Sequence, residues 1–344
     1  MTREGGSDLA TDVDKQSIIG SYAATLATLD AAAARGRALA GSIDRIHLVG
    51  CGGPNRGMLG VEYWVEHFSR ALEIRRYFPA EYITQNPKRL DGRTLVILGS
   101  KSGTTPEAVQ AAEFVRGREC TVIGVTELAE SDLARATPET FLMGAHSGGA
   151  SLFMLLQALV GGMMTEKEKW DLFDPLMSSL HALPRVIADV SADSDHRATQ
   201  DALLLRDDRI LYHVAGGPMF ASAYVWGVCV LMEMQWMHSV PLEAAEFFHG
   251  PFEIVDRNTP LVLYKGEDPS RPLMDRVERF CKRYTERLFI YDSKDYAMPG
   301  VDPRIRGIVA PHVVQSALRR VSEHLAVWHN HPLTTRRYMW KTEY

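Results

Sequence analysis

The chain has few cysteines, and none of them forms a Cys-x-x-Cys pair; the four are Cys51, Cys120, Cys229 and Cys281. Their spacing disfavours a zinc ribbon or a dithiol redox motif. No apolar run is long enough to cross a bilayer, and residues 1–14 contain no apolar signal core. We therefore expect a protein of the reducing cytoplasm that has no membrane partner.

The sequence also lacks concentrated positive charge. It has 38 Lys and Arg against 43 Asp and Glu, a net charge of -5, and its basic clusters are only pairs of arginines. Nucleic-acid-binding proteins usually carry a dense basic patch, so we expect no nucleic-acid partner. The length of 344 residues suits two domains, and an apolar content of 46% is enough to form buried cores.

An internal repeat is the clearest feature that is present. The stretch Asp44-Arg-Ile-His-Leu-Val-Gly-Cys-Gly-Gly-Pro54 matches Asp208-Arg-Ile-Leu-Tyr-His-Val-Ala-Gly-Gly-Pro218, and the offset is 164 residues at both ends (208 − 44 and 218 − 54). Each copy runs from a strand-like segment through Gly-Gly-Pro into a helix-like segment. A repeat of about half the chain predicts two similar domains.

Strands and helices alternate in both halves. We expect further strands at 94–99, 121–125, 260–264, 288–291 and 305–309. We expect helices at 55–72, 106–116, 149–164, 219–237, 271–285 and 311–328, and a polar helical bridge over 165–206. Continuous apolar strands between helices predict an α/β fold in which each domain is a parallel sheet with helices on both faces. We place the parts at 1–20 (N-terminal tail), 21–185 and 190–344.

The run Ser100-Lys-Ser-Gly-Thr-Thr-Pro106 follows the buried strand 94–99 directly. The hydroxyl groups of the run can bind phosphate oxygens, and Gly103 allows the backbone amides to turn inward. Pro106 fits the first position of a helix that Thr105 would cap. A capping box from Thr104 to Glu107 is also possible. The N-terminus of that helix would face the anion. The run therefore predicts a phosphate cradle.

An ordinary β–α turn capped by a hydroxyl residue is the alternative interpretation of this run. One threonine is enough for a cap, and four hydroxyls in six residues exceed that need. The order of a Walker A loop is absent, and Cys51-Gly-Gly-Pro-Asn-Arg-Gly57 does not have dinucleotide-binding spacing.

A second unusual stretch is Ala244-Ala-Glu-Phe-Phe-His-Gly-Pro-Phe-Glu253. Glu246 and His249 would share a face if the stretch were helical, and Glu253 would cap or orient. A structural role for His249 at the Gly-Pro turn stays open. A metal site is a poor match, because no second histidine stands at ligand spacing.

Glu233 lies within the apolar segment Val228-Cys-Val-Leu-Met-Glu-Met-Gln-Trp236. Desolvation there would raise the pKa of its carboxyl group, which suits proton transfer near neutral pH. It could equally be the polar position of an amphipathic helix, or an ion-pair partner. The tail from Arg336 to Tyr344 is basic and aromatic, so we expect it to be docked.

Taken together, these features resemble the double sugar isomerase (SIS) domain family over residues 15–344. The resemblance rests on the repeated halves, on the Ser-x-Ser-Gly-x-Thr loop at 100–105 and on the Glu-Phe-x-His-Gly-Pro motif at 246–251. Within the family, the sequence is similar to the fructosamine 6-phosphate deglycases, which are related to the isomerase half of glutamine–fructose-6-phosphate aminotransferase.

The resemblance implies roles for particular residues. Ser100, Ser102 and Thr105 match the hydroxyls that bind phosphate, and Lys101 contributes backbone. Glu233 matches the catalytic carboxylate, and His249, 16 residues later (249 − 233), matches the ring-opening histidine that reaches the neighbouring subunit's site. A homodimer or larger assembly is implied. Weaker candidates for substrate binding are Gly52, Gly53, Glu246 and Lys341.

The chain departs from the family pattern in two places. Cys51-Gly-Gly-Pro54 stands where relatives commonly carry a hydroxyl residue, and Val230 replaces the lysine that the aminotransferase has before its catalytic glutamate. The second departure argues against amino transfer from ammonia.

The function implied by the resemblance is hydrolysis of a 6-phosphofructosamine to glucose 6-phosphate and a free amino acid, with no metal or organic cofactor. An aldose–ketose phosphosugar isomerase and a non-catalytic phosphosugar sensor remain alternatives.

Overall fold

The computed structural model describes residues 10–144 and 148–343. Part of the predicted N-terminal tail, residues 1–9, and the final Tyr344 lie outside the described residues. The chain divides into two compact units, which we call the first unit (residues 16–184 and 299–308) and the second unit (residues 1–15, 185–298 and 309–344). The divisions near residues 184 and 308 fall within the helices α8 (Phe173–Asp193) and α12 (Arg306–Trp328).

The first unit is built on a five-stranded parallel sheet in the order β2-β1-β3-β4-β5. Its strands are β1 (Arg45–Gly50), β2 (Glu73–Tyr77), β3 (Thr94–Gly99), β4 (Thr121–Thr126) and β5 (Thr140–Leu142). Its helices are α2 (Ala23–Leu39), α3 (Gly52–Phe68), α4 (Pro79–Gln85), α5 (Pro106–Val115), α6 (Asp132–Ala136) and α7 (Gly148–Glu168), and α1 (Lys15–Ser21) precedes them.

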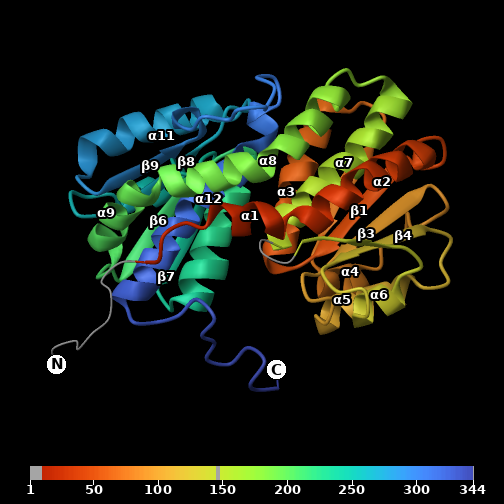
Figure 1. The fold of residues 1–344 in the computed structure, drawn as a ribbon, viewed down its shortest axis with the longest axis horizontal. Coiled ribbons are helices and arrows are strands. Elements are labelled where there is room, and N and C mark those ends of the chain that lie inside the picture. Colours follow the sequence, from red (N-terminus) through yellow and green to blue (C-terminus); the bar gives the residue numbers. More distant parts are fainter. Residues whose placement is uncertain (1–9, 145–147, 344) are drawn as a thin grey trace. The chain divides into compact units, whose positions relative to one another are not determined.

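Alternating side chains of β3 explain how helices cover both faces of this sheet. Val96 and Leu98 pack in one cluster with residues of α4, α5 and α6. Gly99 points to the opposite face, where Leu152 of α7 and Met58 of α3 approach it. Figure 1 shows α2, α3 and α7 on one side of the strands and α4, α5 and α6 on the other.

The second unit has a four-stranded parallel sheet in the order β7-β6-β8-β9. Its strands are β6 (Ile210–Ala215), β7 (His238–Glu243), β8 (Leu261–Lys265) and β9 (Leu288–Asp292). Its helical segments are α9 (Asp195–Leu205), η1 (Gly217–Met219), α10 (Phe220–Tyr224), the π-helical η2 (Val225–Met232), η3 (Pro251–Ile254), α11 (Arg271–Tyr284) and η4 (Ser293–Asp295).

Helices cover both faces of the second sheet as well. Leu261 and Leu263 of β8 pack with Met274 and Val277 of α11. On the other face, the His213 ring meets Trp226 of η2, whose indole donates to Ser322 Oγ of α12 over 2.8 Å. The predicted α/β class with two parallel sheets is therefore confirmed.

The expectation of a strand at 305–309 is wrong, because α12 begins at Arg306. Ile305, Ile308 and Val309 are buried at spacings of three and four residues, and they continue into the buried positions Val313 and Val314. That spacing defines one face of a helix. The helix also includes Pro311, which a prediction from sequence treats as a helix start.

Three strands, β2, β5 and β7, were not predicted. All three lie at the edges of their sheets. β2 is exposed or half-buried at three of its five positions, and β7 contains Pro241, so neither has the continuous apolar run that marks a central strand.

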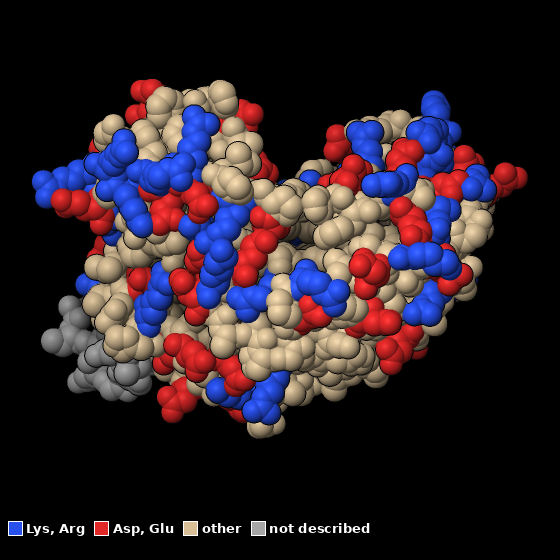
Figure 2. Space-filling model, turned by 90° about the horizontal axis from the view of Figure 1, so that it is seen from above, with Lys and Arg blue, Asp and Glu red and all other residues tan. Residues whose placement is uncertain are grey.

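No helix among the described residues is long and apolar enough to span a bilayer. Basic and acidic side chains lie next to one another over much of the face in Figure 2.

Candidate functional site

The loop after β3 has a backbone that only glycine fits at its centre. The amide of Ser100 still pairs with Val125 O of β4 over 3.1 Å, so the loop leaves the sheet after that residue. Gly103 has φ +67°, and a Cβ atom there would come within 2.2 Å of Ser131 Oγ and 2.7 Å of Thr126 Oγ1. The predicted turn at Gly103 is therefore present for reasons of both conformation and space.

The hydroxyls of this loop bond to one another instead of capping the helix. Ser100 Oγ lies 2.9 Å from Thr105 Oγ1, and Ser102 Oγ lies 2.9 Å from Thr104 Oγ1. Thr105 occupies the N-cap position of α5 and Pro106 follows it, but the Thr105 side chain makes no capping bond. The predicted side-chain cap and the Thr104–Glu107 capping box are thus not formed, and the hydroxyls can rotate toward an anion at the helix start.

Glu127, which the sequence interpretation did not include, lies beside the cradle at the carboxyl end of β4. Its amide donates to Lys101 O over 3.0 Å, and its Oε1 lies 3.9 Å from Lys101 Nζ. Burial raises the pKa of Glu127, and Lys101 partly offsets that effect. The sequence did contain a signal for this residue, because an acidic residue directly after the buried strand next to β3 is expected to lie at the same edge of the sheet as the loop.

The loop between β1 and α3 lies at the same edge of the sheet, because Gly50 of β1 pairs with Gly99 of β3. Gly52 has φ +57°, and no atom lies near the Cβ position of Gly52 or Gly53. Burial, and secondarily Glu107, raises the pKa of the Cys51 thiol, so this residue offers a weak protonated donor.

In the second unit, Glu233 follows η2 directly. π-Helical turns are rare and occur frequently at functional sites. The Glu233 side chain is 28% exposed and lies 2.9 Å from Arg336 Nη2 through its Oε1 atom. Burial raises the pKa of the Glu233 carboxyl group, and the Arg336 charge and hydrogen bond oppose that shift without cancelling it. The expected rise is confirmed, and Glu233 is an ion-pair partner as well.

The stretch around His249 is a set of turns and not the helix considered above. Phe247 is fully buried, and Phe248 and Phe252 pack against Phe280 of α11. These rings fix the turn because they bury its apolar side.

The polar side chains of this stretch, Glu246, His249 and Glu253, are all exposed. The His249 amide donates to Glu246 O over 2.9 Å, which closes the turn. Across residues 10–144 and 148–343, no group of three His, Cys, Asp or Glu side chains has the geometry of a metal site.

Lys341 lies in the tail of the second unit. Its Nζ donates to Arg336 O over 2.6 Å, so it braces the backbone of the residue that contacts Glu233. The tail is docked only in part: Arg336 is buried against Glu233, whereas the aromatic residues Tyr338 and Trp340 are 64% and 77% exposed. The contact from Arg336 to Glu233 was not predicted.

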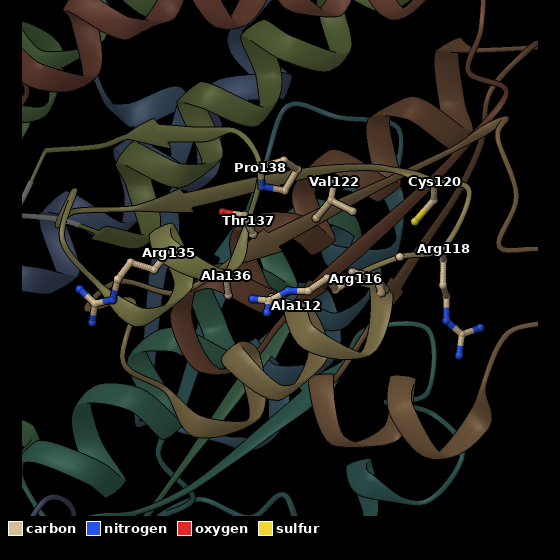
Figure 3. A pocket seen from close by; sticks show the side chains of 11 residues that line it. Ala112, Arg116, Arg118, Cys120, Val122, Arg135, Ala136, Thr137 and Pro138 are labelled. Carbon is tan, nitrogen blue, oxygen red and sulfur yellow. The ribbon is translucent and has the colours of Figure 1, made fainter.

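A groove of about 440 Å³ lies at the opposite end of β4, near its first residues. Three arginines line it, but Arg135 bonds Asp132 and Arg118 bonds Phe114 O and Asn86. In Figure 3 the Arg118 and Arg135 side chains extend in different directions. The groove therefore does not focus positive charge on one point and is not the candidate site.

Comparisons with known proteins complete the assignment. No family model matches the chain. Fructosamine deglycase FrlB of Bacillus subtilis is 35% identical over 88% of this chain and 93% of its own length. The agropine synthesis conjugase of Rhizobium rhizogenes is 31% identical over 87% of each chain, and fructoselysine 6-phosphate deglycase of Escherichia coli is 27% identical over 86% and 85%.

A solved Bacillus subtilis structure, provisionally named a phosphosugar isomerase, is 34% identical, covers 93% of this chain and 99% of its own, and superposes with a TM-score of 0.87. The identities and the near-complete coverage agree with the duplicated sheets, the hydroxyl-lined loop and the half-buried glutamate. The chain belongs to the double sugar isomerase (SIS) domain family, among relatives that include the fructosamine deglycases.

Proposed function

We propose that the chain is a deglycase that hydrolyses a 6-phosphofructosamine to glucose 6-phosphate and a free amino acid. The observation that carries the proposal is Glu233, a half-buried carboxylate of raised pKa at the end of a π-helical segment. Such a group suits proton transfer near neutral pH. The similarity to a fructosamine deglycase over most of both chains supports the same reaction.

The substrate's phosphate would bind at residues 100–105, where Ser100, Ser102 and Thr105 offer hydroxyls and α5 begins. Gly52 and Gly53 leave open space at the neighbouring strand end for the sugar. This arrangement holds the phosphate at C6 and leaves C1 and C2 for the chemistry. Glu246 and Lys341 remain weaker candidates for substrate contacts.

The reaction begins with opening of the furanose ring, assisted by His249. Glu233 then removes a proton from C1, giving an enolamine, and a proton is returned to C2. The product is an imine at C1, and water adds to it and releases the amine, leaving the aldehyde of glucose 6-phosphate. Each general acid–base step of this kind contributes about 10² to 10⁴ in rate.

The protein would act as a homodimer or a larger assembly, in which His249 serves the neighbouring subunit's site. Phe247 anchors the turn in its own unit, and the His249 side chain is exposed. Mixing His249→Ala and Glu233→Gln subunits would then restore activity in the heterodimer. Verified heterodimers without any recovery would disprove the shared site.

An aldose–ketose phosphosugar isomerase is the second candidate, because a structure named as a phosphosugar isomerase is 34% identical. It would use the same glutamate and histidine. The products separate the two reactions, since only deglycation releases a free amino acid. The conjugase among the relatives makes it worthwhile to assay the condensation direction as well.

The test is a screen of fructosyl amino acids phosphorylated at C6, with glucose 6-phosphate and the free amino acid both measured. Glu233→Gln should lower kcat by about 10² to 10⁴. Glu62→Gln is the matched control, because Glu62 is 27% exposed and also pairs with an arginine, Arg76, at 3.3 Å. Undiminished turnover in Glu233→Gln would refute the proposal.

A further inference from the structure

The C-terminal tail is fixed to the segment that follows Glu233. Gln235, two residues on, is buried, and its Nε2 donates to His331 O over 2.8 Å. Its Oε1 faces His329 Nδ1 at 3.0 Å, and the other ring nitrogen of His329 faces Arg206 O at 2.8 Å. One side chain next to Glu233 therefore anchors residues 329–331, which precede the tail.

Trp236 adds a second attachment in the same turn. It has φ +57°, a conformation that costs a residue with a side chain about 1–2 kcal/mol. Its ring lies 4.4 Å from the His331 ring in an edge contact, and the Arg337 guanidinium lies 4.1 Å above it. A strained residue persists where its surroundings hold it, so the tail stabilises the turn that carries Glu233.

Arg336 is the tail residue that reaches Glu233 itself. It is only 9% exposed, and its Nη1 donates to Leu333 O and Thr335 O, each over 2.9 Å. Those carbonyls belong to the backbone just before the tail, so they hold the guanidinium in place independently of Glu233. Its Nη2 is left to donate to Glu233 Oε1 over 2.9 Å.

The remaining Arg336 donor, Nε, is buried and has no hydrogen-bond partner among the described residues. Nε and Nη2 share one edge of the guanidinium, the edge that grips a carboxylate through two parallel bonds. The observed single bond therefore leaves room for a small movement of Glu233 that keeps the pair intact.

We propose that Arg336 is a positioning residue for Glu233, holding the carboxylate in place and in the ionised form that can accept the first proton. The inference rests on the proposed role of Glu233 as the base. Arg336 itself touches no reacting atom in this scheme.

The charges around the turn support this assignment. Other titratable groups on the segments around the turn are Arg337 and Lys341 of the tail, His329 and His331 before it, Cys229 of η2, Arg206, and His238 at the start of β7. Among the described residues, burial and Arg336 alone account for the shifted pKa of Glu233, and they act in opposite directions. Without Arg336, burial would act unopposed, and less of the glutamate would be ionised at neutral pH.

The experiment follows the Glu233 carboxyl group directly, by ¹³C NMR of protein labelled at its glutamate carboxyls. The signal that is missing in Glu233→Gln identifies the residue, and no substrate is needed. In Arg336→Met its titration midpoint should move to higher pH, while Arg337→Met, the neighbouring arginine, should leave it in place. With substrate, Arg336→Met should lose about tenfold in kcat at pH 7 and less at higher pH.

A folded Arg336→Met protein with an unmoved Glu233 titration would overturn the proposal, and so would an equal shift in Arg337→Met. If Arg336→Met does not fold, Arg336→Lys decides, since it keeps the charge but not the fork. Arg336→Lys should shift the titration midpoint of Glu233 little and still lower kcat. A kcat equal to that of the wild type would contradict the role of Arg336 in positioning Glu233. The titration is independent of turnover, so a failure of the deglycase assay is distinguishable from a failure of this inference.

Discussion

The loop after β3 and the loop after β8 occupy corresponding places in the two sheets, yet their chemistry is opposite. Both strands lie next to the first strand of their sheet, and both loops lead into a helix. The first loop, residues 100–105, has four hydroxyls and no acidic residue. The second, residues 266–270, contains Glu267 and Asp268.

The acidic groups of the second loop bond mainly to the loop and its neighbours, although Asp268 Oδ2 is buried and has no hydrogen-bond partner among the described residues. Asp268 Oδ1 accepts from the Ser270 amide over 2.9 Å, and Ser293 Oγ donates to Glu267 over 3.0 Å. Arg271, at the start of α11, is held by Asp292 at 2.9 Å. A loop of this kind repels a phosphate, so the duplicated fold does not carry a second copy of the hydroxyl-rich loop.

The helices that follow the repeated Gly-Gly-Pro also differ. α3 is a regular helix of 17 residues, whereas the second copy passes through the π-helical η2 and ends at Glu233. The proposed phosphate-binding residues therefore lie in the first copy of the repeat, and the proposed proton-transfer group lies in the second.

The sharpest test of this contrast removes hydroxyls from the cradle. Ser100→Ala with Thr105→Val should lower kcat/KM by about 10² or more, because hydrogen bonds to a charged group contribute about 1.5–3 kcal/mol each. The loss should appear equally in binding of glucose 6-phosphate, measured by calorimetry.

Ser270→Ala, in the sister loop, is the matched control for that double variant. Its hydroxyl lies at the start of α11 in a loop that carries negative charge, so phosphate binding should be unchanged. An equal loss of phosphate affinity in Ser270→Ala would show that both loops contribute to phosphate binding.

The second loop depends on its ion pairs, and Asp292→Asn tests that dependence. Burial raises the pKa of Asp292, but bonds from Arg271 and the Lys294 amide outweigh it, and the net shift is downward from 3.8. The folded state therefore holds fewer protons, and this stabilisation is present above about pH 3.8 and is lost as the pH falls below it.

We expect Asp292→Asn to lower the free energy of unfolding by about 3 kcal/mol at pH 7, because Arg271 and Lys265 would lose a buried partner. Urea unfolding should show a much smaller difference from wild type near pH 3. Asp132→Asn, which removes an exposed pair with Arg135, should change the midpoint little. A pH-independent loss in Asp292→Asn would contradict the ionic explanation.

The cradle, by contrast, depends on its backbone shape. Gly103→Ala should cost about 2 kcal/mol or more, from the unfavourable φ and from the contact with Ser131. Gly117→Ala isolates the first effect, since Gly117 has φ +80° and no atom near its Cβ position. Thermal unfolding should therefore rank wild type above Gly117→Ala and both above Gly103→Ala, and equal melting temperatures of the two variants would exclude the contact.

The central strands and the glycine-centred loop after β3 could be predicted from the sequence because their signals are local. Strand 94–99 is a continuous apolar run, and the hydroxyls and glycine follow it directly. The edge strands β2, β5 and β7 could not, since β2 carries charged residues, β7 contains a proline, and β5 is only three residues long and has no buried position. The segment 305–309 was misread because its three β-branched residues, Ile305, Ile308 and Val309, fit either a strand or one face of a helix.

The contacts between the tail and Glu233 are the part of the candidate site that could not be predicted from the sequence. Arg336 is 103 residues from Glu233 (336 − 233), and no periodicity relates them. The basic and aromatic composition of the tail predicted that it docks, but its aromatic residues Tyr338 and Trp340 are largely exposed, and the buried contact is made by Arg336. Pairings between distant segments depend on tertiary packing, which a single sequence does not reveal.

The smallest expected effect on stability concerns two buried histidines, one in each sheet, that each contact a tyrosine hydroxyl. His47 Nδ1 lies 2.9 Å from Tyr82 OH in the first unit, and His213 Nδ1 lies 2.9 Å from Tyr264 OH in the second. Burial lowers the pKa of His47 to about 4 and that of His213 to about 3, so both are neutral in the folded protein near pH 7.

Tyr82→Phe and Tyr264→Phe each remove the partner of a buried ring nitrogen, at a cost of about 1 kcal/mol or more. Tyr264→Phe should cost more, because His213 is wholly buried and its Nε2 already has no partner among the described residues. Wild type should also lose stability as the pH falls below 6.5, where the unfolded histidines take up a proton that the folded ones do not. Urea midpoints at pH 7.5 and pH 5 measure both effects, and a greater loss in Tyr82→Phe would mean that burial does not rank the two sites.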